Sequence, residues 1–301
     1  MERENYSAEY FERALARAYG CEMLRVENFH IEAVSQKGEN FCSAIYRVAL
    51  DFRRSPGGAL ESGKYILKDL LPAVAALGTN EKDMFELLLP AMQAILEEAP
   101  KEIGERKLSP NCLLVEISAG KELYIMEDLG ALGYGSFDRR QGLNLEEAKI
   151  CVRKLAQFHG ASKVDFQNCY WGSPAIDLYF LFYTSLKPEL LLNSQDEILN
   201  HYFDNLLETL RQCGYKDTLP TFGQLKDEMK RCLFYGYYTV VCELPICCSS
   251  PEASVDFGVH TFVDTDAMLK KRHQLFANER VRQTIKSTLL MLDSEGILET
   301  P

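Results

Sequence analysis

Three residues of this 301-residue chain have side-chain types and an order that suit phosphate chemistry: Lys68, Glu81 and Asp165. Lys68 lies within an apolar, strand-like run, and Glu81 opens the helix-like run that follows. A strand lysine paired with a glutamate on the next helix is the arrangement that kinases place at the phosphates of ATP. Asp165 stands between Val164 and Phe166, where an acid needs a cation or hydrogen-bond donors. Because hard carboxylate oxygen suits Mg²⁺ beside phosphates, the three residues together predict a magnesium–nucleotide site.

Each of these residues also has an ordinary alternative. A lysine in mid-strand is usually a solvated edge residue, and a glutamate such as Glu81 in a first helical turn favours the helix dipole. Asp165 is equally well explained as the cap of a turn. The kinase interpretation is favoured only by the order of features along the chain, which runs from a glycine turn through a strand lysine, a helix glutamate, a connector and a helix to an Asp-Phe pair.

The glycine turn precedes the strand that pairs with the Lys68 run. Its backbone N–H groups could bind phosphates over Gly38, Asn40 and Ser43. A single glycine is a weak signal, and an ordinary hairpin is the alternative.

A second backbone segment suits a nucleotide base. The strand that ends at Glu127 continues through Asp128 and Leu129 into a glycine-rich connector. In a two-lobed nucleotide-binding protein the backbone of such a segment meets the adenine edge. The alternative is a core strand followed by a turn.

The first half of the chain predicts a small α+β lobe. A helix over 7–19 begins at Ser7 and ends at Gly20, and a later helix runs from residue 79 or 80 to 98 with a kink at Pro90. Alternating and β-branched runs predict strands over 26–34, 41–52, 65–70, 112–118 and 122–127.

The second half of the chain predicts a mainly helical lobe. Asn144 and Glu147 form a capping-box-like pair at the start of a helix that Gly160 ends, and a short buried strand follows over 164–166. Ser173 and Pro174 then begin a helix that is apolar nearly all round and is therefore expected to be buried. Further helices are predicted over 195–213, 222–242, 265–276 and 279–295.

Composition excludes several function classes. The net charge is −11 with a pI of about 5.1, which disfavours nucleic acid as a partner. We expect neither a signal peptide nor a membrane span, and the ten cysteines lack zinc-site spacing. Reduced thiols in a cytoplasmic protein are the expectation, and the oligomeric state is not indicated.

The chain resembles the ecdysteroid kinase-like (CHK kinase-like) family, distant relatives of choline kinases and aminoglycoside phosphotransferases in the protein-kinase-like superfamily. The resemblance covers most of the chain, and its most specific parts are the EDL and DFQ…GSPA.DL segments. The matching pieces are GENFCSAIYRV, YILKDLLP, EKDMFELLLP, YIMEDLGALGYGSFDR, AKICVRKLAQFHGAS, VDFQNCYWGSPAIDLYFLFYTS and FANERVRQTIKSTLLMLDSEGIL.

The resemblance implies a bilobal kinase-like fold and Mg-ATP-dependent phosphorylation of a hydroxyl on a small lipophilic alcohol or steroid. It implies that Lys68 holds the α- and β-phosphates, that Glu81 is its helix partner, and that Asp165 binds magnesium. The adenine hinge falls on Glu127, Asp128 and Leu129. The corresponding lobes are residues 1–129 and 130–301.

One departure from the family pattern concerns catalysis. Family members carry a catalytic loop of the form HGDxxxxN, whose Asp is the base and whose Asn holds magnesium. Here His159-Gly160 is followed by Ala161, and no histidine of the chain precedes Gly-Asp. The chain is therefore expected to lack the catalytic-loop segment near 162–163, to have an incomplete helical lobe, and to contain no catalytic residue of this loop.

Three hypotheses about function follow. The first is a shortened family member or isoform that is catalytically inactive, so that its status as an enzyme stays open. The second is a pseudokinase-type module that binds Mg-ATP weakly, or a lipophilic ligand. The third is a non-catalytic interaction protein, with which the acidic surface and the aromatic-rich helices are compatible.

Overall fold

The structure is a computed structural model, and it describes residues 6–34, 42–76, 80–100, 105, 107–118, 121–165, 172–254, 257, 261 and 264–298, with the backbone alone for 163–165. Contacts divide the chain into two compact units. The first comprises residues 1–90, 109–135 and 254–265, and the second comprises 91–108, 136–253 and 266–301.

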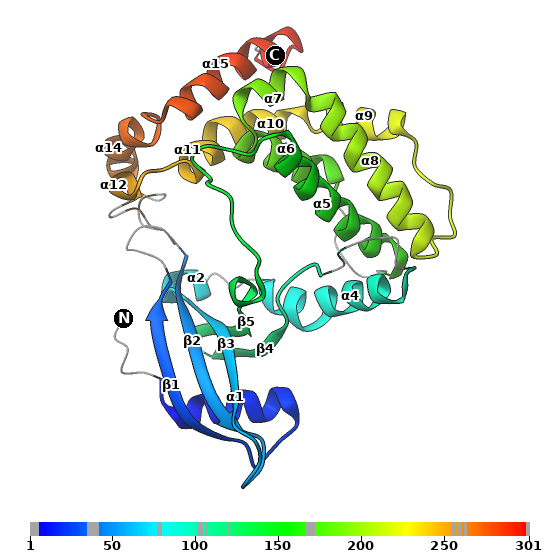
Figure 1. Cartoon of the computed structure of the whole chain (residues 1–301). Coiled ribbons are helices and arrows are strands. Elements are labelled where there is room, and N and C mark those ends of the chain that lie inside the picture. Colours follow the sequence, from blue (N-terminus) through cyan, green and yellow to red (C-terminus); the bar gives the residue numbers. More distant parts are fainter. Residues whose placement is uncertain are drawn as a thin grey trace. The chain divides into compact units, whose positions relative to one another are not determined.

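The first unit is built on a five-stranded sheet with the strand order β1-β2-β3-β5-β4 (Figure 1). Every neighbouring pair is antiparallel, so the sheet consists of hairpins and one helical connection between β3 and β4. The five predicted strands are confirmed with small shifts at their ends. Their bounds are β1 (Arg25–Ala33), β2 (Ser43–Arg53), β3 (Glu61–Leu70), β4 (Cys112–Ser118) and β5 (Lys121–Glu127).

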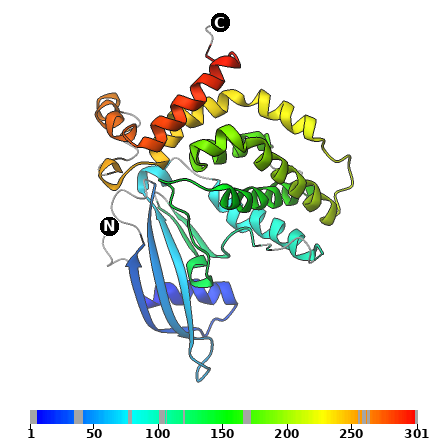
Figure 2. The same cartoon turned by 45° about the horizontal axis from the view of Figure 1, so that its top comes forward.

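Helix α1 (Ala8–Tyr19) covers one face of this sheet (Figures 1 and 2). The Ser7 hydroxyl accepts a hydrogen bond from the Tyr10 N–H at the first turn, and Gly20 ends the helix with a φ of 63°. Both ends are those predicted from the sequence. Phe11 and Leu15 are buried against the apolar residues of β1, β2, β3 and β5 that face the helix.

The segment around Pro90 is helical throughout and contains a π-helical insertion. It runs from α3 (Glu81–Asp83) through η2 (Met84–Leu88) into α4 (Leu89–Glu98), after a short α2 (Pro72–Ala75). The Leu89 N–H donates to the Met84 carbonyl, five residues back. Since Pro90 has no N–H to continue the regular ladder, the widened turn accommodates the proline that the sequence predicted to kink the helix. The same device recurs at η5 (Thr239–Glu243), which directly precedes Leu244 and Pro245.

The second unit is helical. Its first long helix begins with the predicted capping box, in which the Glu147 N–H donates to Asn144 Oδ1 and the Asn144 N–H donates to Glu147 Oε2. The predicted single helix over 222–242 is wrong, because the backbone leaves helical geometry at Cys232 (φ −95°, ψ 9°). After the 3₁₀ turn η4 (Leu129–Leu132), the helices are α5 (Leu145–Asp165), α6 (Pro174–Ser185), α7 (Pro188–Asn193), α8 (Gln195–Gln212), α9 (Phe222–Arg231), α10 (Leu233–Tyr238), α11 (Leu244–Cys247), α12 (Pro251–Ser254), α14 (Thr265–Leu275) and α15 (Glu279–Ser294).

None of the helices in the described part of the chain has both the length and the apolar character needed to cross a bilayer.

Helix α5 contradicts two sequence predictions. The helix does not end at Gly160, and residues 164–165 are not a strand, because helical backbone continues to Asp165. Gly160 is buried where α5 packs on α8, and a Cβ atom there would lie 2.6 Å from Thr209 Cγ2. The glycine therefore permits close approach of two helices, which lie side by side in Figure 1, rather than ending one of them.

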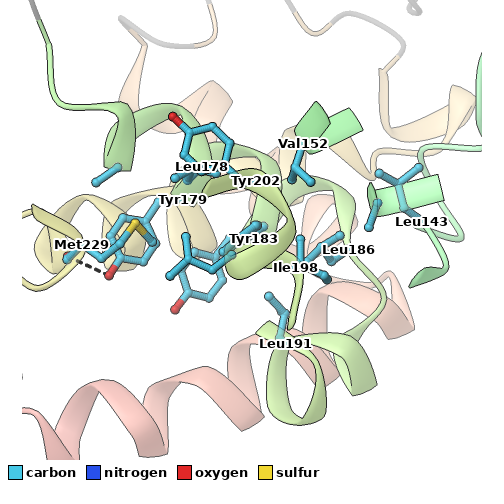
Figure 3. Close-up of a cluster of buried hydrophobic side chains, with 14 of the residues drawn as sticks. Leu143, Val152, Leu178, Tyr179, Tyr183, Leu186, Leu191, Ile198, Tyr202 and Met229 are labelled. Carbon is cyan, nitrogen blue, oxygen red and sulfur yellow. Dashed lines mark hydrogen bonds between the residues drawn. The ribbon is translucent and has the colours of Figure 1, made fainter. Parts of the chain in front are cut away.

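Helix α6 is the predicted buried helix, and it lies in the core of the second unit. The Ser173 hydroxyl accepts from the Ala175 N–H, and Pro174 is the first helical residue, as predicted. Leu178 and Phe182 are fully buried in a cluster drawn from α5, α6, α8, α9 and α15 (Figure 3). This cluster includes several tyrosines, so their hydroxyls must find partners inside the unit or remain without one.

Candidate functional site

The sheet face opposite α1 carries the candidate chemistry of the first unit. Ile45, Lys68 and Tyr124 are cross-strand partners on β2, β3 and β5 and therefore share one face. Lys68 Nζ lies 5.8 Å from the centre of the Tyr124 ring, and Tyr124 is fully buried. Because β3 lies between β2 and β5, Lys68 is not on an edge strand. Its ammonium group is partly enclosed over the middle of the sheet.

Lys68 forms an ion pair with Glu81, the first residue of α3. The two side chains come from elements separated by α2, and each is about a quarter exposed (22% and 27%). Phe85 of η2 packs on Tyr124 with a ring separation of 5.6 Å, which holds this helical segment against the sheet. The contact that the sequence predicted between a strand lysine and a helix glutamate is therefore present.

The segment Glu127–Leu129 leaves the end of β5 and enters the turn η4. The Asn111 N–H donates to Glu127 Oε2 at 3.1 Å, and the Glu127 N–H donates to the Asn111 carbonyl at 2.9 Å. The Asp128 carboxylate accepts from Arg47 Nε at 2.6 Å and from the Gly130 N–H at 3.0 Å. The side chains of Glu127 and Asp128 thus stabilise the path of the backbone.

Electrostatics keep Asp128 ionised. Burial alone would raise the pKa of this carboxyl, but the hydrogen bond and charge of Arg47, together with the N–H groups of Gly130 and Ala131, hold its pKa below the usual value. The same carboxylate raises the pKa of the Arg47 guanidinium. The Asp128 carboxylate is therefore paired with Arg47 of the protein itself.

The remaining predicted site residues are placed as follows. Ser43 is the buried first residue of β2, opposite Leu70. Gly38 and Asn40 lie outside the described residues. Asp165 is the last residue of α5 in the second unit, described by its backbone alone, and its magnesium role stays a prediction.

A polar cluster around the buried His159 in the second unit was not predicted as a site. His159 Nδ1 lies 2.7 Å from the Tyr202 hydroxyl, and its Nε2 lies 3.0 Å from Asp177 Oδ2. These residues lie on α5, α8 and α6. The partners are 43 and 18 residues away from His159, so no local spacing in the sequence signals the cluster.

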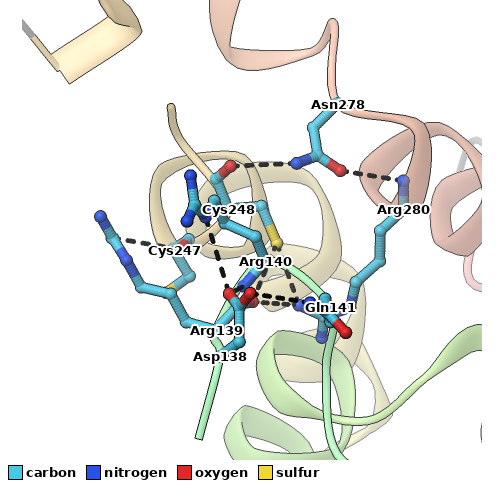
Figure 4. Close-up of polar contacts among 8 residues, drawn as sticks. All are labelled: Asp138, Arg139, Arg140, Gln141, Cys247, Cys248, Asn278 and Arg280. Atoms are coloured by element: carbon cyan, nitrogen blue, oxygen red, sulfur yellow. Dashed lines mark hydrogen bonds and ion pairs between the residues drawn. The ribbon is translucent and has the colours of Figure 1, made fainter. Parts of the chain in front are cut away.

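A second unpredicted cluster surrounds the buried Arg280 at the start of α15 (Figure 4). Its guanidinium donates to the carbonyls of Arg139, Thr184 and Leu186 at 2.7, 2.7 and 3.0 Å, and to Cys248 Sγ at 3.0 Å. Burial raises the pKa of the Cys248 thiol in spite of the neighbouring arginines. Arg280 therefore joins the connector after η4, the end of α6 and the end of α11 inside one unit.

Metal-binding groups do not gather in the described ranges. There, no set of three or more His, Cys, Asp and Glu side chains could hold a metal ion. Each described cysteine is free, including Cys242, Cys247 and Cys248, whose clustering in the sequence lacks zinc-site spacing.

The fold is of the kinase-like bilobal class, since a small antiparallel sheet with a strand-lysine–helix-glutamate pair precedes a helical portion. A model of the ecdysteroid kinase-like family matches residues 37–164 and 163–215, which is more than half of the chain. The chain belongs to this family. Comparison with curated proteins and with solved structures found no match.

Proposed function

We propose that this chain is a nucleotide-binding member of the ecdysteroid kinase-like family that does not transfer phosphate efficiently. In this proposal Lys68 holds the α- and β-phosphates of ATP, Glu81 orients Lys68, and Asp165 is a magnesium ligand. The backbone of 127–129 meets the adenine edge, and the turn with Gly38, Asn40 and Ser43 covers the phosphates. The acceptor class that the family suggests is a small lipophilic alcohol such as a steroid.

The observation that carries nucleotide binding is the ion pair between Lys68 and Glu81. The pair is formed on one face of the sheet, beside the enclosed ring of Tyr124. A lysine held in this way is a preorganised cation for phosphate oxygens. Bound magnesium would supply charge neutralisation of those oxygens.

Loss of catalysis is supported by the form of the family match. The two matched segments meet at residues 163–164, which fits a family segment missing from the chain near 162–163. His159 and Gly160 lie inside α5, which supports the proposal that they do not begin a catalytic loop. Without the base and the second metal ligand, positioning of the acceptor hydroxyl is lost, at a cost of orders of magnitude in rate.

In this proposal the protein has two lobes, residues 1–129 and 130–301. The protein is located in the cytoplasm.

Nucleotide binding is tested by titrating the chain with ATP and magnesium while following the unfolding temperature. The wild-type chain should be stabilised in a concentration-dependent way, by mass action. Lys68→Ala should abolish this shift. Lys64→Ala is the matched control, because Lys64 is an exposed lysine on the same strand and face, and it should leave the shift unchanged. Absence of a shift in the wild type would remove the nucleotide part of the proposal and favour an interaction protein.

Transfer is tested separately with labelled ATP and a panel of steroid alcohols. No labelled product above the buffer control is expected. Robust product that depends on Lys68 would overturn the proposed inactivity, while leaving nucleotide binding supported.

A further inference from the structure

Two cations, Arg47 and Lys68, lie on the same face of the sheet and form ion pairs with different carboxylates. Arg47 of β2 is the cross-strand partner of Ile66, which in turn pairs with Met126 of β5. Asp128 follows Met126 by two residues. The Arg47 side chain therefore reaches past β3 to contact Asp128, because β3 separates β2 from β5 in the sheet.

The Asp128 carboxylate links Arg47 to the backbone that follows Asp128. One oxygen, Oδ2, accepts from Arg47 Nε at 2.6 Å, and the other, Oδ1, accepts from the Gly130 N–H at 3.0 Å. The Asp128 carbonyl accepts from the Ala131 N–H at 3.0 Å. Asp128 thus caps η4, and its side chain is only 4% exposed whereas that of Arg47 is 38% exposed. Removing Arg47 would leave a nearly buried carboxylate without its cation, which is costly.

We infer that Arg47 is a positioning residue of the nucleotide site. By holding Asp128, it sets the backbone of 127–129, the segment that meets the adenine edge under the proposed function on which this inference rests. Lys68, paired with Glu81, acts on the phosphates and does not depend on Arg47. Arg47 therefore affects the affinity for the base, and Lys68 affects the affinity for the phosphates.

The test uses the full chain with two ligands, Mg-ATP and Mg-tripolyphosphate, the second of which lacks a base. Arg47→Met should weaken Mg-ATP binding by about tenfold, because binding must then order the backbone of 127–129, and should leave tripolyphosphate binding unchanged. Lys68→Ala should weaken both ligands. Arg53→Met is the matched control, because Arg53 lies on the same strand and makes an equally short ion pair (2.6 Å) with Glu27. It should change neither affinity.

Hydrogen exchange supplies a readout that does not need a ligand. The amides of Gly130 and Ala131 bond to Asp128 and should exchange faster in Arg47→Met than in the wild type or in Arg53→Met. Arg47→Lys, which keeps the charge without the planar guanidinium, should fall between them.

The outcomes separate this inference from the proposed function. Unchanged ATP affinity in Arg47→Met, or an equal loss for ATP and tripolyphosphate, would overturn the inference while nucleotide binding stands. A wild-type chain that binds neither ligand would remove the proposed function. In that case, unchanged exchange at Gly130 in Arg47→Met would overturn the positioning role as well, and faster exchange would support it.

Discussion

Tyr179 and Tyr183 stack within the core of the second unit, with ring centres 5.8 Å apart and planes inclined by 11° (Figure 3). Their hydroxyls differ in whether they form a hydrogen bond. The Tyr179 hydroxyl donates to the Met229 carbonyl at 2.8 Å, whereas that of Tyr183 is buried without a hydrogen-bond partner in the described structure. Burial raises the pKa of Tyr183 to about 12, so the hydroxyl stays protonated at neutral pH.

This difference predicts opposite effects of one substitution at two stacked positions. Tyr183→Phe removes a hydroxyl that is dehydrated without compensation and should raise the free energy of unfolding by up to about 1 kcal/mol. Tyr179→Phe removes a satisfied donor and should lower it by about 1–2 kcal/mol. Urea denaturation of both variants measures the two values. An equal loss of stability in both would show that the Tyr183 hydroxyl has a partner.

Gly160 should not tolerate alanine. A Cβ atom there would lie 2.6 Å from Cγ2 and 2.9 Å from Cβ of Thr209, a β-branched residue that cannot turn away. Helix propensity alone would favour alanine by about 1 kcal/mol, but overpacking of this kind costs about 1–3 kcal/mol. We expect net destabilisation of Gly160→Ala in denaturant unfolding.

Two further variants test the steric cause of that loss. Thr209→Ser removes Cγ2 and keeps the hydroxyl that donates to the Asn205 carbonyl, so Gly160→Ala should cost less in this background. Gly223→Ala is the matched control, since its Cβ would meet only Thr221 Oγ1 at an ordinary 3.8 Å. It should be neutral or stabilising. Loss of stability in Gly223→Ala as large as in Gly160→Ala would point away from packing.

Arg280 should be needed for stability of the second unit. Its guanidinium donates to the carbonyls of Thr184 and Leu186 at the end of α6. It also donates to the carbonyl of Arg139, and Arg280 and Arg139 are both drawn in Figure 4. Arg280→Met leaves the carbonyls of the buried residues Thr184 and Leu186 without this donor and should cost on the order of 3 kcal/mol. Arg280→Lys keeps the charge but cannot reproduce the planar fork, so it should lose most of the same stability.

The control for Arg280 is Arg282, two residues along α15. Arg282 is exposed and pairs with the exposed Glu279 at 2.9 Å. Such surface pairs contribute about 0–1 kcal/mol, so Arg282→Met should have little effect on thermal unfolding. A similarly small effect of Arg280→Met would contradict the role assigned to its buried contacts.

Glu228 provides a pH-dependent prediction. The hydrogen bonds from Arg231 and Ser173 lower the pKa of Glu228 to about 2. Because this is below the usual value of about 4.3, the interaction stabilises the fold at pH values above the unfolded pKa. That contribution should be lost as pH falls from about 4 through 2. Arg231→Ala should raise the pKa of Glu228 part of the way towards its usual value, because the Ser173 hydrogen bond remains, and should reduce this acid dependence.

NMR titration of the Glu228 side chain measures this pKa directly. Thermal unfolding of the wild type and Arg231→Ala between pH 5 and 2 gives the linked stability change, which should be smaller in the variant. Since the pair is largely exposed, added salt should weaken the difference. An unshifted pKa in the wild type would show that Arg231 is not held on Glu228 in solution.

The predictions that the structure confirmed rest on short-range physics. Ser7, Gly20, the pair Asn144 and Glu147, and Ser173 each act on backbone groups within a few residues. The sequence therefore contains everything that decides those helix ends. The alternating strands of the first unit are predictable for the same reason, because side-chain direction alternates along every strand.

The predictions that the structure contradicted failed for a different reason. Gly160 is locally a stop signal, yet its position is decided by Thr209 on another helix, 49 residues away. The strand predicted over 164–166 fails with it, because helical backbone continues to Asp165. Close packing of two helices at Gly160 thus outweighs a local preference of about 1 kcal/mol.

The sequence by itself determined the family, the order of the lysine strand, the glutamate helix and the connector, and the lack of a Gly-Asp catalytic motif. Apart from the Lys68–Glu81 pair, only the tertiary structure decided which polar side chains meet. Arg47 reaches Asp128 across an intervening strand, and His159 joins Tyr202 and Asp177 from three helices. These partners are 18 to 81 residues apart in the chain. No spacing rule links residues at such separations, because their contact depends on the packing of whole elements.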